Sequence, residues 1–196
     1  MCLTGYPPLD YSGSVPHLIL TGPPGVGKTS TVLCMARMLL GDKEKEAVKE
    51  LNASDERGLE VVREEIKSFA VKKVNLPPNR TKVMILDEAD SMTEGAQQAL
   101  RMIISSNSDT TRFVLCCNDS GKIIDAIQSR CIVMRFSRLN DDDIRMNLKR
   151  IIENEKIRIS EDAMKSLLFI ADGDMRKAVN NLQACYQFLT DKASTE

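Results

Sequence analysis

Short apolar segments recur along the first two thirds of the chain, separated by longer segments that mix apolar and charged residues. The apolar segments are HLILTG (17–22), VKELNAS (48–54), KVMILDEAD (82–90), TRFVLCCN (111–118) and CIVMRF (131–136). Their length and apolar content predict β-strands, because the strands of a parallel sheet are short and buried on both faces.

The segments between these strands carry apolar residues at the three-and-four spacing of amphipathic helices. They predict helices over residues 29–40, 58–73 and 93–106. Strands that alternate with helices form a parallel sheet with helices on both faces. We therefore predict an α/β domain built on a five-stranded parallel sheet flanked by helices.

The strand signals stop at Asn140, and the remaining sequence predicts three helices. These are DDDIRMNLKRIIENE, SEDAMKSLLFIAD and DMRKAVNNLQACYQFL, each opened by an Asp or Ser that can cap a helix. We predict an α/β domain over residues 1–138, a small all-helical domain over 139–190 and a tail over 191–196.

Composition excludes several classes of protein. The 196 residues are 42% hydrophobic, which is enough for a core, and the net charge of −1 gives no global signature of a nucleic-acid binder. The six cysteines lack C-x-x-C spacing, so neither a zinc site nor a disulfide framework is indicated, and a single histidine excludes His-based catalysis. With no apolar run of membrane-spanning length and no secretion signal, we predict an intracellular protein without membrane contact.

The strongest chemical motif is GPPGVGKT at 22–29, a complete G-x-x-x-x-G-K-[ST] between a predicted strand and a predicted helix. Its glycines allow the backbone to curl so that successive N–H groups face the phosphates of ATP or ADP. Lys28 is predicted to reach the β and γ phosphates, and Thr29 to offer its hydroxyl to Mg²⁺. The alternative is an ordinary Gly/Pro turn before a helix. The predicted nucleotide-binding residues of the motif are Gly22, Pro23, Pro24, Gly25, Val26, Gly27, Lys28 and Thr29.

A second motif, VMILDEAD at 83–90, ends an apolar strand with two adjacent carboxylates. Parallel sheets expose the carboxyl ends of their strands to ligands. We predict that Asp87 holds Mg²⁺ through its water shell and that Glu88 orients the water that attacks the γ-phosphate. By itself, the acid pair could instead be a solvated turn or a cap for the helix at 93.

Seven motifs together resemble the small subunits of replication factor C, a family of sliding-clamp loaders within the AAA+ ATPases. They occur in the family's order and span roughly residues 17 to 188: GPPGVGKT, LNASDERG, LDEADSMT, AQQALR, the CN at 117–118, IQSRC and GDMRKAVNNLQ. The resemblance implies that the α/β and helical domains are the two AAA+ subdomains, the second acting as a lid, with ATP bound between them.

The resemblance also implies roles for three polar residues. Asn118 matches the position called sensor 1, where an amide contacts the γ-phosphate and the attacking water. Arg176 resembles sensor 2, a cation carried by the lid, and Arg130 resembles an arginine finger that acts in trans on a neighbouring subunit's ATP. From the residues alone, a strand-ending Asn and two solvated arginines remain the alternatives.

Basic residues near helix starts are candidates for contact with the phosphates of DNA. These are Arg57, Arg63, Arg80 and Arg101. For each residue alone, a solvated charged face is the alternative. The resemblance further implies that Gln98 relays the presence of DNA to the catalytic acid.

The family implies an ATP-dependent clamp-loader subunit that acts in the nucleus during DNA replication and repair. Its implied partners are the other replication factor C subunits of a hetero-pentamer, a PCNA-like sliding clamp and primer-template DNA. Three alternatives stay open: a subunit of another AAA+ ring, a nucleotide-binding assembly module without independent hydrolysis, and a small-molecule kinase.

The chain also departs from the family's pattern at both ends. Residues 1–16 replace a longer segment that in the family carries a KYRP-like sequence and helps to form the adenine pocket. After Glu196 we expect no C-terminal helical collar, the domain that joins the family's subunits into a ring.

Overall fold

The computed structural model describes residues 15–54 and 59–193, and the side chains of 59–63 and 188–193 lie outside that description. The chain divides into two compact units. The α/β unit comprises Met1–Thr21 and Thr29–Arg135, and the helical unit comprises Gly22–Lys28 and Phe136–Glu196. The glycine-rich loop at 22–28 thus groups with the C-terminal helices, although it lies early in the sequence.

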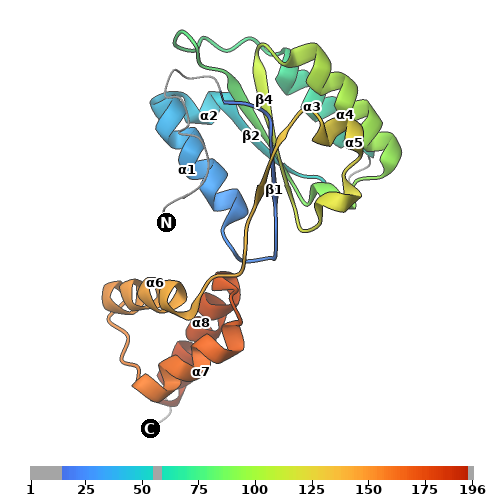
Figure 1. Cartoon of the computed structure of the whole chain (residues 1–196). Coiled ribbons are helices and arrows are strands. Elements are labelled where there is room, and N and C mark those ends of the chain that lie inside the picture. Colours follow the sequence, from blue (N-terminus) through green and yellow to red (C-terminus); the bar gives the residue numbers. More distant parts are fainter. Residues whose placement is uncertain (1–14, 55–58, 194–196) are drawn as a thin grey trace. The chain divides into compact units, whose positions relative to one another are not determined.

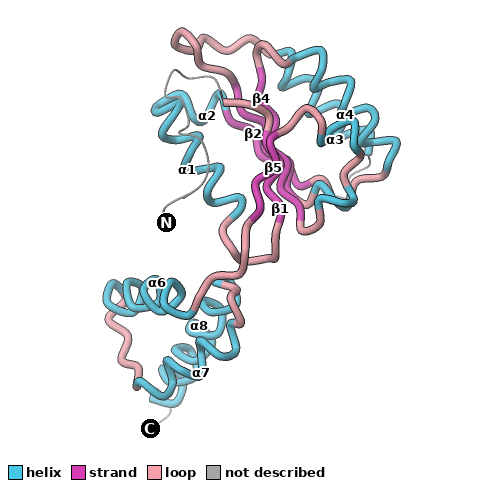
Figure 2. The backbone as a smooth tube through the Cα atoms, viewed as in Figure 1, coloured by secondary structure: helices cyan, strands magenta, loops and turns pink. Residues whose placement is uncertain are grey.

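Five parallel strands form one sheet in the α/β unit, as the sequence predicts (Figure 2). They are β1 (Leu18–Thr21), β2 (Val48–Asn52), β3 (Lys82–Asp87), β4 (Thr111–Cys117) and β5 (Ile132–Arg135). Their order across the sheet is β2-β3-β4-β1-β5, so β3, β4 and β1 are its interior strands. All pairings are parallel, and the carboxyl ends of the strands therefore meet at one edge.

Helices cover both faces of this sheet (Figure 1). On one face lie α1 (Lys28–Leu40) and α2 (Glu44–Ala47), and on the other lie α3 (Leu59–Val71), α4 (Glu94–Asn107) and α5 (Asp125–Gln128). The long helices match the predicted segments to within two residues at each end. The sequence analysis did not anticipate α2 and α5, which are single turns and too short to show helical periodicity.

The core of the α/β unit forms where α3 and α4 pack on the interior strands. Met84 and Leu86 of β3 and Phe113 and Leu115 of β4 are completely buried. The helices contribute the buried residues Ile66, Ala70, Leu100 and Ile104. This packing fixes the strand ends from which the polar side chains of the candidate site project.

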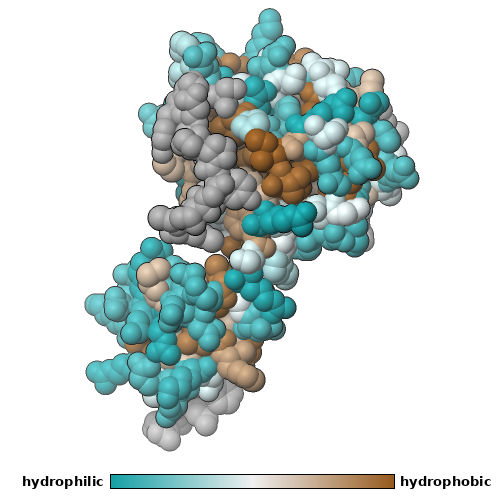
Figure 3. Space-filling view, in the orientation of Figure 1, coloured by the Kyte–Doolittle hydropathy of each residue, from teal (hydrophilic) through white to brown (hydrophobic). Residues whose placement is uncertain are grey.

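The helical unit has its own apolar core between α6 (Asp141–Asn154), α7 (Glu161–Ala171) and α8 (Met175–Ala193). The core residues are Ile144, Leu148, Met164, Leu167, Leu168, Ala171, Ala178 and Leu182. The visible surface of these helices is mostly hydrophilic (Figure 3). Within the described residues, no helix is long and apolar enough to cross a membrane.

Side-chain caps begin each helix of this unit. Ser160 accepts a hydrogen bond from the backbone N–H of Ala163, and Asp174 accepts one from that of Lys177. These two caps are of the predicted kinds. The cap of α6 is instead Asn140, which accepts a 2.7 Å hydrogen bond from the N–H of Asp143. An asparagine oxygen caps a helix as well as a carboxylate does, so the helix begins where predicted.

Candidate functional site

The glycine-rich loop between β1 and α1 adopts backbone angles that glycine tolerates better than other residues. The φ angles of Gly25 and Gly27 are +69° and +92°, in the left-handed region that residues with a Cβ rarely adopt. At Gly25 the requirement is also steric, because a Cβ there would lie 1.7 Å from Oδ1 of Asp174 in the helical unit. A loop curled in this way can turn consecutive N–H groups toward an anion.

Lys28, the last residue of this loop and the first of α1, keeps its ammonium group within the loop. Its Nζ donates hydrogen bonds to the carbonyl oxygens of Gly22 at 2.7 Å and of Pro23 at 2.9 Å. The residue is 9% exposed, Val26 beside it is buried, and Pro24 faces solvent. The loop therefore surrounds one positive charge, which suits an anionic ligand.

Thr29 and Asp87 lie together at the carboxyl edge of the sheet, although 58 residues separate them in the chain. The hydroxyl of Thr29 donates a 2.9 Å hydrogen bond to Oδ2 of Asp87. Both residues are half-buried within the α/β unit. The two residues predicted to share a metal ion are thus neighbours.

This pair fits Mg²⁺ better than it fits a metal held wholly by protein. Within residues 15–54 and 59–193, no cluster of three or more His, Cys, Asp or Glu side chains could hold an ion. Mg²⁺ in nucleotide sites takes one or two protein oxygens and completes its octahedron with phosphate oxygens and waters. A hydroxyl beside a carboxylate supplies the right donors in the right number.

Glu88 follows β3 in the left-handed conformation, with φ 54° and ψ 37°. Its side chain is exposed, and Oε2 accepts a 2.5 Å hydrogen bond from the hydroxyl of Ser54. Ser54 follows β2, whose last residue, Asn52, pairs in register with Asp87. The side-chain oxygen of Asn52 accepts the Ser54 backbone N–H at 2.9 Å. Ser54 and Asn52 are therefore site residues that the sequence analysis missed.

Asn118 lies directly after β4 at the same edge, where its side chain is exposed. Its backbone N–H donates to Oδ2 of Asp90 at 3.2 Å, and its carbonyl oxygen accepts a 3.3 Å hydrogen bond from the hydroxyl of Thr21. The predicted sensor is therefore hydrogen-bonded to Asp90 of the second motif and to Thr21, the last residue of β1. Asp90 and Thr21 are further residues that the sequence analysis did not assign to the site.

Arg130 is exposed just beyond α5. Its Nη1 donates hydrogen bonds to the carbonyl oxygen of Ala126 at 2.7 Å and to the hydroxyl of Ser129 at 3.4 Å. In the next residue, burial raises the pKa of the Cys131 thiol to about 11, so this thiol stays protonated near neutral pH. An exposed guanidinium just after a short helix is in a position to contact another molecule.

Gln97, rather than the predicted Gln98, is the glutamine of α4 that connects parts of the α/β unit. Gln97 is 3% exposed, and its Nε2 donates to the carbonyl oxygens of Met92 and Lys122. Its Oε1 accepts a 2.8 Å hydrogen bond from the N–H of Ile124. Gln98, one residue further along α4, is exposed. The helical phase explains the difference, since Gln97 shares the buried face of α4 with Leu100 and Ile104.

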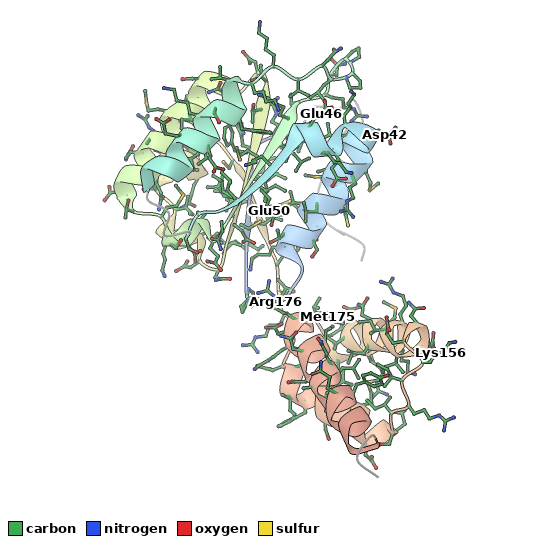
Figure 4. The ribbon with its side chains drawn as sticks, turned by 180° about the vertical axis from the view of Figure 1, so that it is seen from behind. Asp42, Glu46, Glu50, Lys156, Met175 and Arg176 are labelled. Atoms are coloured by element: carbon green, nitrogen blue, oxygen red, sulfur yellow. The ribbon has the colours of Figure 1, made fainter. Side chains whose placement is uncertain are left out.

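Arg176 belongs to the helical unit, where it is the second residue of α8 and is exposed (Figure 4). The backbone N–H of its neighbour Met175 donates a 3.1 Å hydrogen bond to the carbonyl oxygen of Gly25. This contact lies within one compact unit, so the start of α8 lies beside the glycine-rich loop. Arg176 therefore lies near the loop whose backbone and Lys28 ammonium group suit a phosphate.

Of the four predicted DNA contacts, the structure describes two side chains, and both are half-buried. Arg80 lies in the loop before β3, and Arg101 lies on α4, where its Nη2 contacts Sδ of Met102 at 3.2 Å. In each, one guanidinium nitrogen is buried without a hydrogen-bond partner in the described part of the chain. Arg57 and the side chain of Arg63 lie outside the described residues.

Comparison with known proteins places these features in a family context. A family model described as "ATPase family associated with various cellular activities (AAA)" matches residues 18–139. The chain is 58% identical over 178 residues to "Probable replication factor C subunit 2" of Dictyostelium discoideum, covering 91% of this chain and 53% of that protein. It is 52% identical over 172 residues to "Replication factor C subunit 4" of Saccharomyces cerevisiae, covering 88% and 53%. These relatives confirm the resemblance to replication factor C small subunits.

Solved structures confirm the fold. A variant of RuvB from Thermotoga maritima aligns with a TM-score of 0.69 at 17% identity, covering 91% of this chain and 57% of that one. At this identity the likeness concerns the fold alone. The chain spans about half the length of the curated relatives that it matches.

Proposed function

This chain belongs to the AAA family of ATPases, and on that premise we propose that it binds ATP with Mg²⁺ and hydrolyses the γ-phosphate. The proposal rests chiefly on the 2.9 Å hydrogen bond between Thr29 and Asp87. That bond joins Thr29, the last residue of the GPPGVGKT motif and part of α1, to the end of β3, so a residue from each of the two motifs that nucleotide hydrolysis requires lies at one sheet edge.

Each residue of the site has a distinct part in this proposal. The N–H groups of residues 22–28 and the ammonium of Lys28 bind the phosphates. Thr29 and Asp87 would hold Mg²⁺, which would supply positive charge to the phosphate oxygens. Arg176, at the start of α8, adds a second cation for the γ-phosphate.

Hydrolysis requires a water aligned with the bond that breaks. Glu88 orients this water and accepts its proton while the γ-phosphorus–oxygen bond to ADP breaks. The amide of Asn118 contacts the water and the γ-phosphate. Arg130 acts on the nucleotide of a neighbouring subunit, which is consistent with its exposure.

We extend the proposal to a clamp-loader subunit because the curated relatives, 47–58% identical, are replication factor C subunits. The proposed partners are the other subunits of a hetero-pentamer, a sliding clamp and primer-template DNA contacted through Arg57, Arg63, Arg80 and Arg101. The proposed compartment is the nucleus. ATP binding would order the assembly around an open clamp, and hydrolysis would release the clamp onto DNA.

The test is ATP hydrolysis by the chain reconstituted with the other loader subunits, with and without clamp and primed DNA. Replacing Glu88 by Gln keeps the shape of the side chain but removes the proton acceptor, so turnover should fall by about 100-fold while ATP still binds. Glu94→Gln, at an exposed position on α4, is the matched control and should leave turnover unchanged.

Arg130→Ala tests the contact in trans. It should abolish stimulated turnover without weakening ATP binding to the substituted subunit itself. Turnover that Glu88→Gln leaves intact would refute hydrolysis at this site. Failure to join the other subunits, together with turnover that clamp and DNA do not stimulate, would refute the clamp-loader role. It would not refute ATP binding by the chain, which a separate binding measurement tests.

A further inference from the structure

The peptide groups around Asn118 are held from two sides. Oδ2 of Asp90 accepts hydrogen bonds from the N–H of Asn118 at 3.2 Å and from that of Asp119 at 3.3 Å. The hydroxyl of Thr21 donates to the carbonyl oxygen of Asn118 at 3.3 Å. Because β4 ends at Cys117, the backbone N–H and C=O groups beyond it cannot pair with a neighbouring strand. They need other hydrogen-bond partners.

Strand order explains why these two side chains reach the same residue. In the sheet, β4 lies between β3 and β1. Asp90 is in the 3₁₀ turn Ala89–Ser91 that follows β3, and Thr21 is the last residue of β1, next to the glycine-rich loop. The backbone of the segment after β4 is therefore hydrogen-bonded to the end of β1 and to the turn after β3.

We propose that Asp90 is a positioning residue: its carboxylate holds the backbone of Asn118 so that the amide side chain points to the γ-phosphate and the attacking water. This inference rests on the proposed function. In this proposal Asp90 acts on hydrolysis through Asn118, whose backbone it binds.

The carboxylate suits this task because one charged oxygen accepts two N–H groups from consecutive residues. Hydrogen bonds to a charged acceptor are stronger than those between neutral groups. The Asn118 side chain is exposed, so the direction of its amide depends on the backbone that carries it. Without the contact, the amide would sample other directions and lose the alignment that hydrolysis requires.

Asp90→Ala and Asp90→Asn separate positioning from general stability. In the reconstituted assembly, Asp90→Ala should lower kcat by about 10-fold and leave the KM for ATP within about twofold. Asp90→Asn retains an oxygen that accepts both N–H groups and should recover most of kcat. Asp109→Asn, at an exposed turn before β4, is the matched control and should behave like the unsubstituted chain. Equal losses in Asp90→Ala and Asp90→Asn, or a rise in KM without a fall in kcat, would overturn the inference.

A double substitution tests whether Asp90 acts through Asn118. If it does, Asn118→Ala should lower kcat, and adding Asp90→Ala should lower it no further. Additive losses would contradict the proposed route.

Amide hydrogen exchange tests the contact without relying on catalysis. The N–H groups of Asn118 and Asp119 should exchange faster in Asp90→Ala than in Asp90→Asn or the unsubstituted chain. Unchanged exchange would overturn the inference. Absence of ATP turnover in the unsubstituted assembly would instead refute the proposed function, and exchange would still decide whether Asp90 holds this backbone.

Discussion

The hydroxyl of Ser54 donates a 2.5 Å hydrogen bond to Oε2 of Glu88, so a residue just after the neighbouring strand β2 binds the proposed catalytic carboxylate. The register of β2 and β3 makes this contact possible, since Asn52 lies opposite Asp87. A carboxylate oxygen that accepts this hydrogen bond is less available to orient a water.

Ser54→Ala should therefore raise the basal rate of ATP hydrolysis. Removing the hydroxyl frees one oxygen of Glu88, and we expect an increase of about threefold in the absence of DNA, comparable to the loss of a modest hydrogen bond. Steady-state phosphate release measures this rate. Ser91→Ala is the control, because the Ser91 hydroxyl bonds to the backbone oxygen of Glu88 and not to its carboxylate. A lower rate in Ser54→Ala would mean that the contact supports catalysis.

Thr29→Ala should raise the Mg²⁺ concentration needed for half-maximal ATP hydrolysis by about 10-fold, since it removes one of two protein oxygens proposed for the ion. Thr29→Ser retains the hydroxyl and should restore the original dependence. A Mg²⁺ titration at saturating ATP measures the shift. If the alanine and serine variants titrate alike, the hydroxyl does not contribute to the metal site.

Buried Lys82 should contribute to the free energy of unfolding, because its side chain caps the C-terminal end of α3. Its Nζ donates to the carbonyl oxygens of Phe69, Ala70 and Lys72 at 2.6–2.7 Å, and the residue is 3% exposed. Burial, followed by repulsion from Lys72, lowers its pKa. Lys82→Met should lower the free energy of unfolding by about 2 kcal/mol, because three carbonyl groups lose their donor. Urea unfolding, with exposed Lys73→Met as control, measures this, and equal losses in both variants would contradict it.

His17 should make stability depend on pH. Its Nδ1 accepts a 3.1 Å hydrogen bond from the N–H of Phe113, which requires an unprotonated nitrogen. Burial, and then the positive charge of Arg112, lower the pKa of His17 from its ordinary value of 6.5. The unfolded chain therefore binds this proton more readily, and stability falls as pH decreases from 6.5 toward the lowered pKa.

His17→Asn isolates this effect, because an amide oxygen can accept the same N–H but does not titrate near neutral pH. The unfolding midpoint in urea, followed from about pH 7.5 to about pH 5, should fall more steeply in the unsubstituted chain than in the variant. His17 is the single histidine of the sequence, so a difference between the two slopes belongs to this residue. Parallel slopes would show that His17 keeps its ordinary pKa in the fold.

The sequence predicts the positions of the two motifs better than it predicts the residues that surround them. The glycine-rich motif at 22–29 and the acid pair Asp87–Glu88 depend on local spacing, so their strand-to-loop placement could be predicted. The roles of Ser54 and Asp90 depend on the strand order β2-β3-β4-β1-β5, which places segments distant in sequence side by side. Strand order is a property of the tertiary fold, and periodicity along the chain does not encode it.

Gln97 is a case in which the sequence held a usable signal. Its spacing to Leu100 and Ile104 is three and seven residues, which assigns it to the buried face of α4. A glutamine at such a position must find hydrogen-bond partners inside the protein, because burying an amide without them is costly. The family resemblance instead implies the relay role for Gln98, which the same helical spacing places on the exposed side of α4.

Gln97→Leu should accordingly loosen the segment around α5, and Arg130 lies just after this helix. The Gln97 amide binds Lys122 and Ile124 in the segment leading into α5, and leucine fills a similar volume without those bonds. We expect stimulated hydrolysis in the reconstituted assembly to fall by about 10-fold, because a displaced Arg130 would no longer align with the neighbouring subunit's nucleotide.

The matched substitution Gln98→Leu removes an exposed amide from the same helix and should leave stimulated hydrolysis within about twofold of the original. Nucleotide binding by the substituted subunit should be unaffected in both variants, since the hydrogen bonds of Gln97 go to Met92, Lys122 and Ile124 and Gln98 is exposed. A larger loss in Gln98→Leu than in Gln97→Leu would mean that the exposed glutamine is the relay. Signal transmission along α4 would then depend on what binds its outer face rather than on its buried hydrogen bonds.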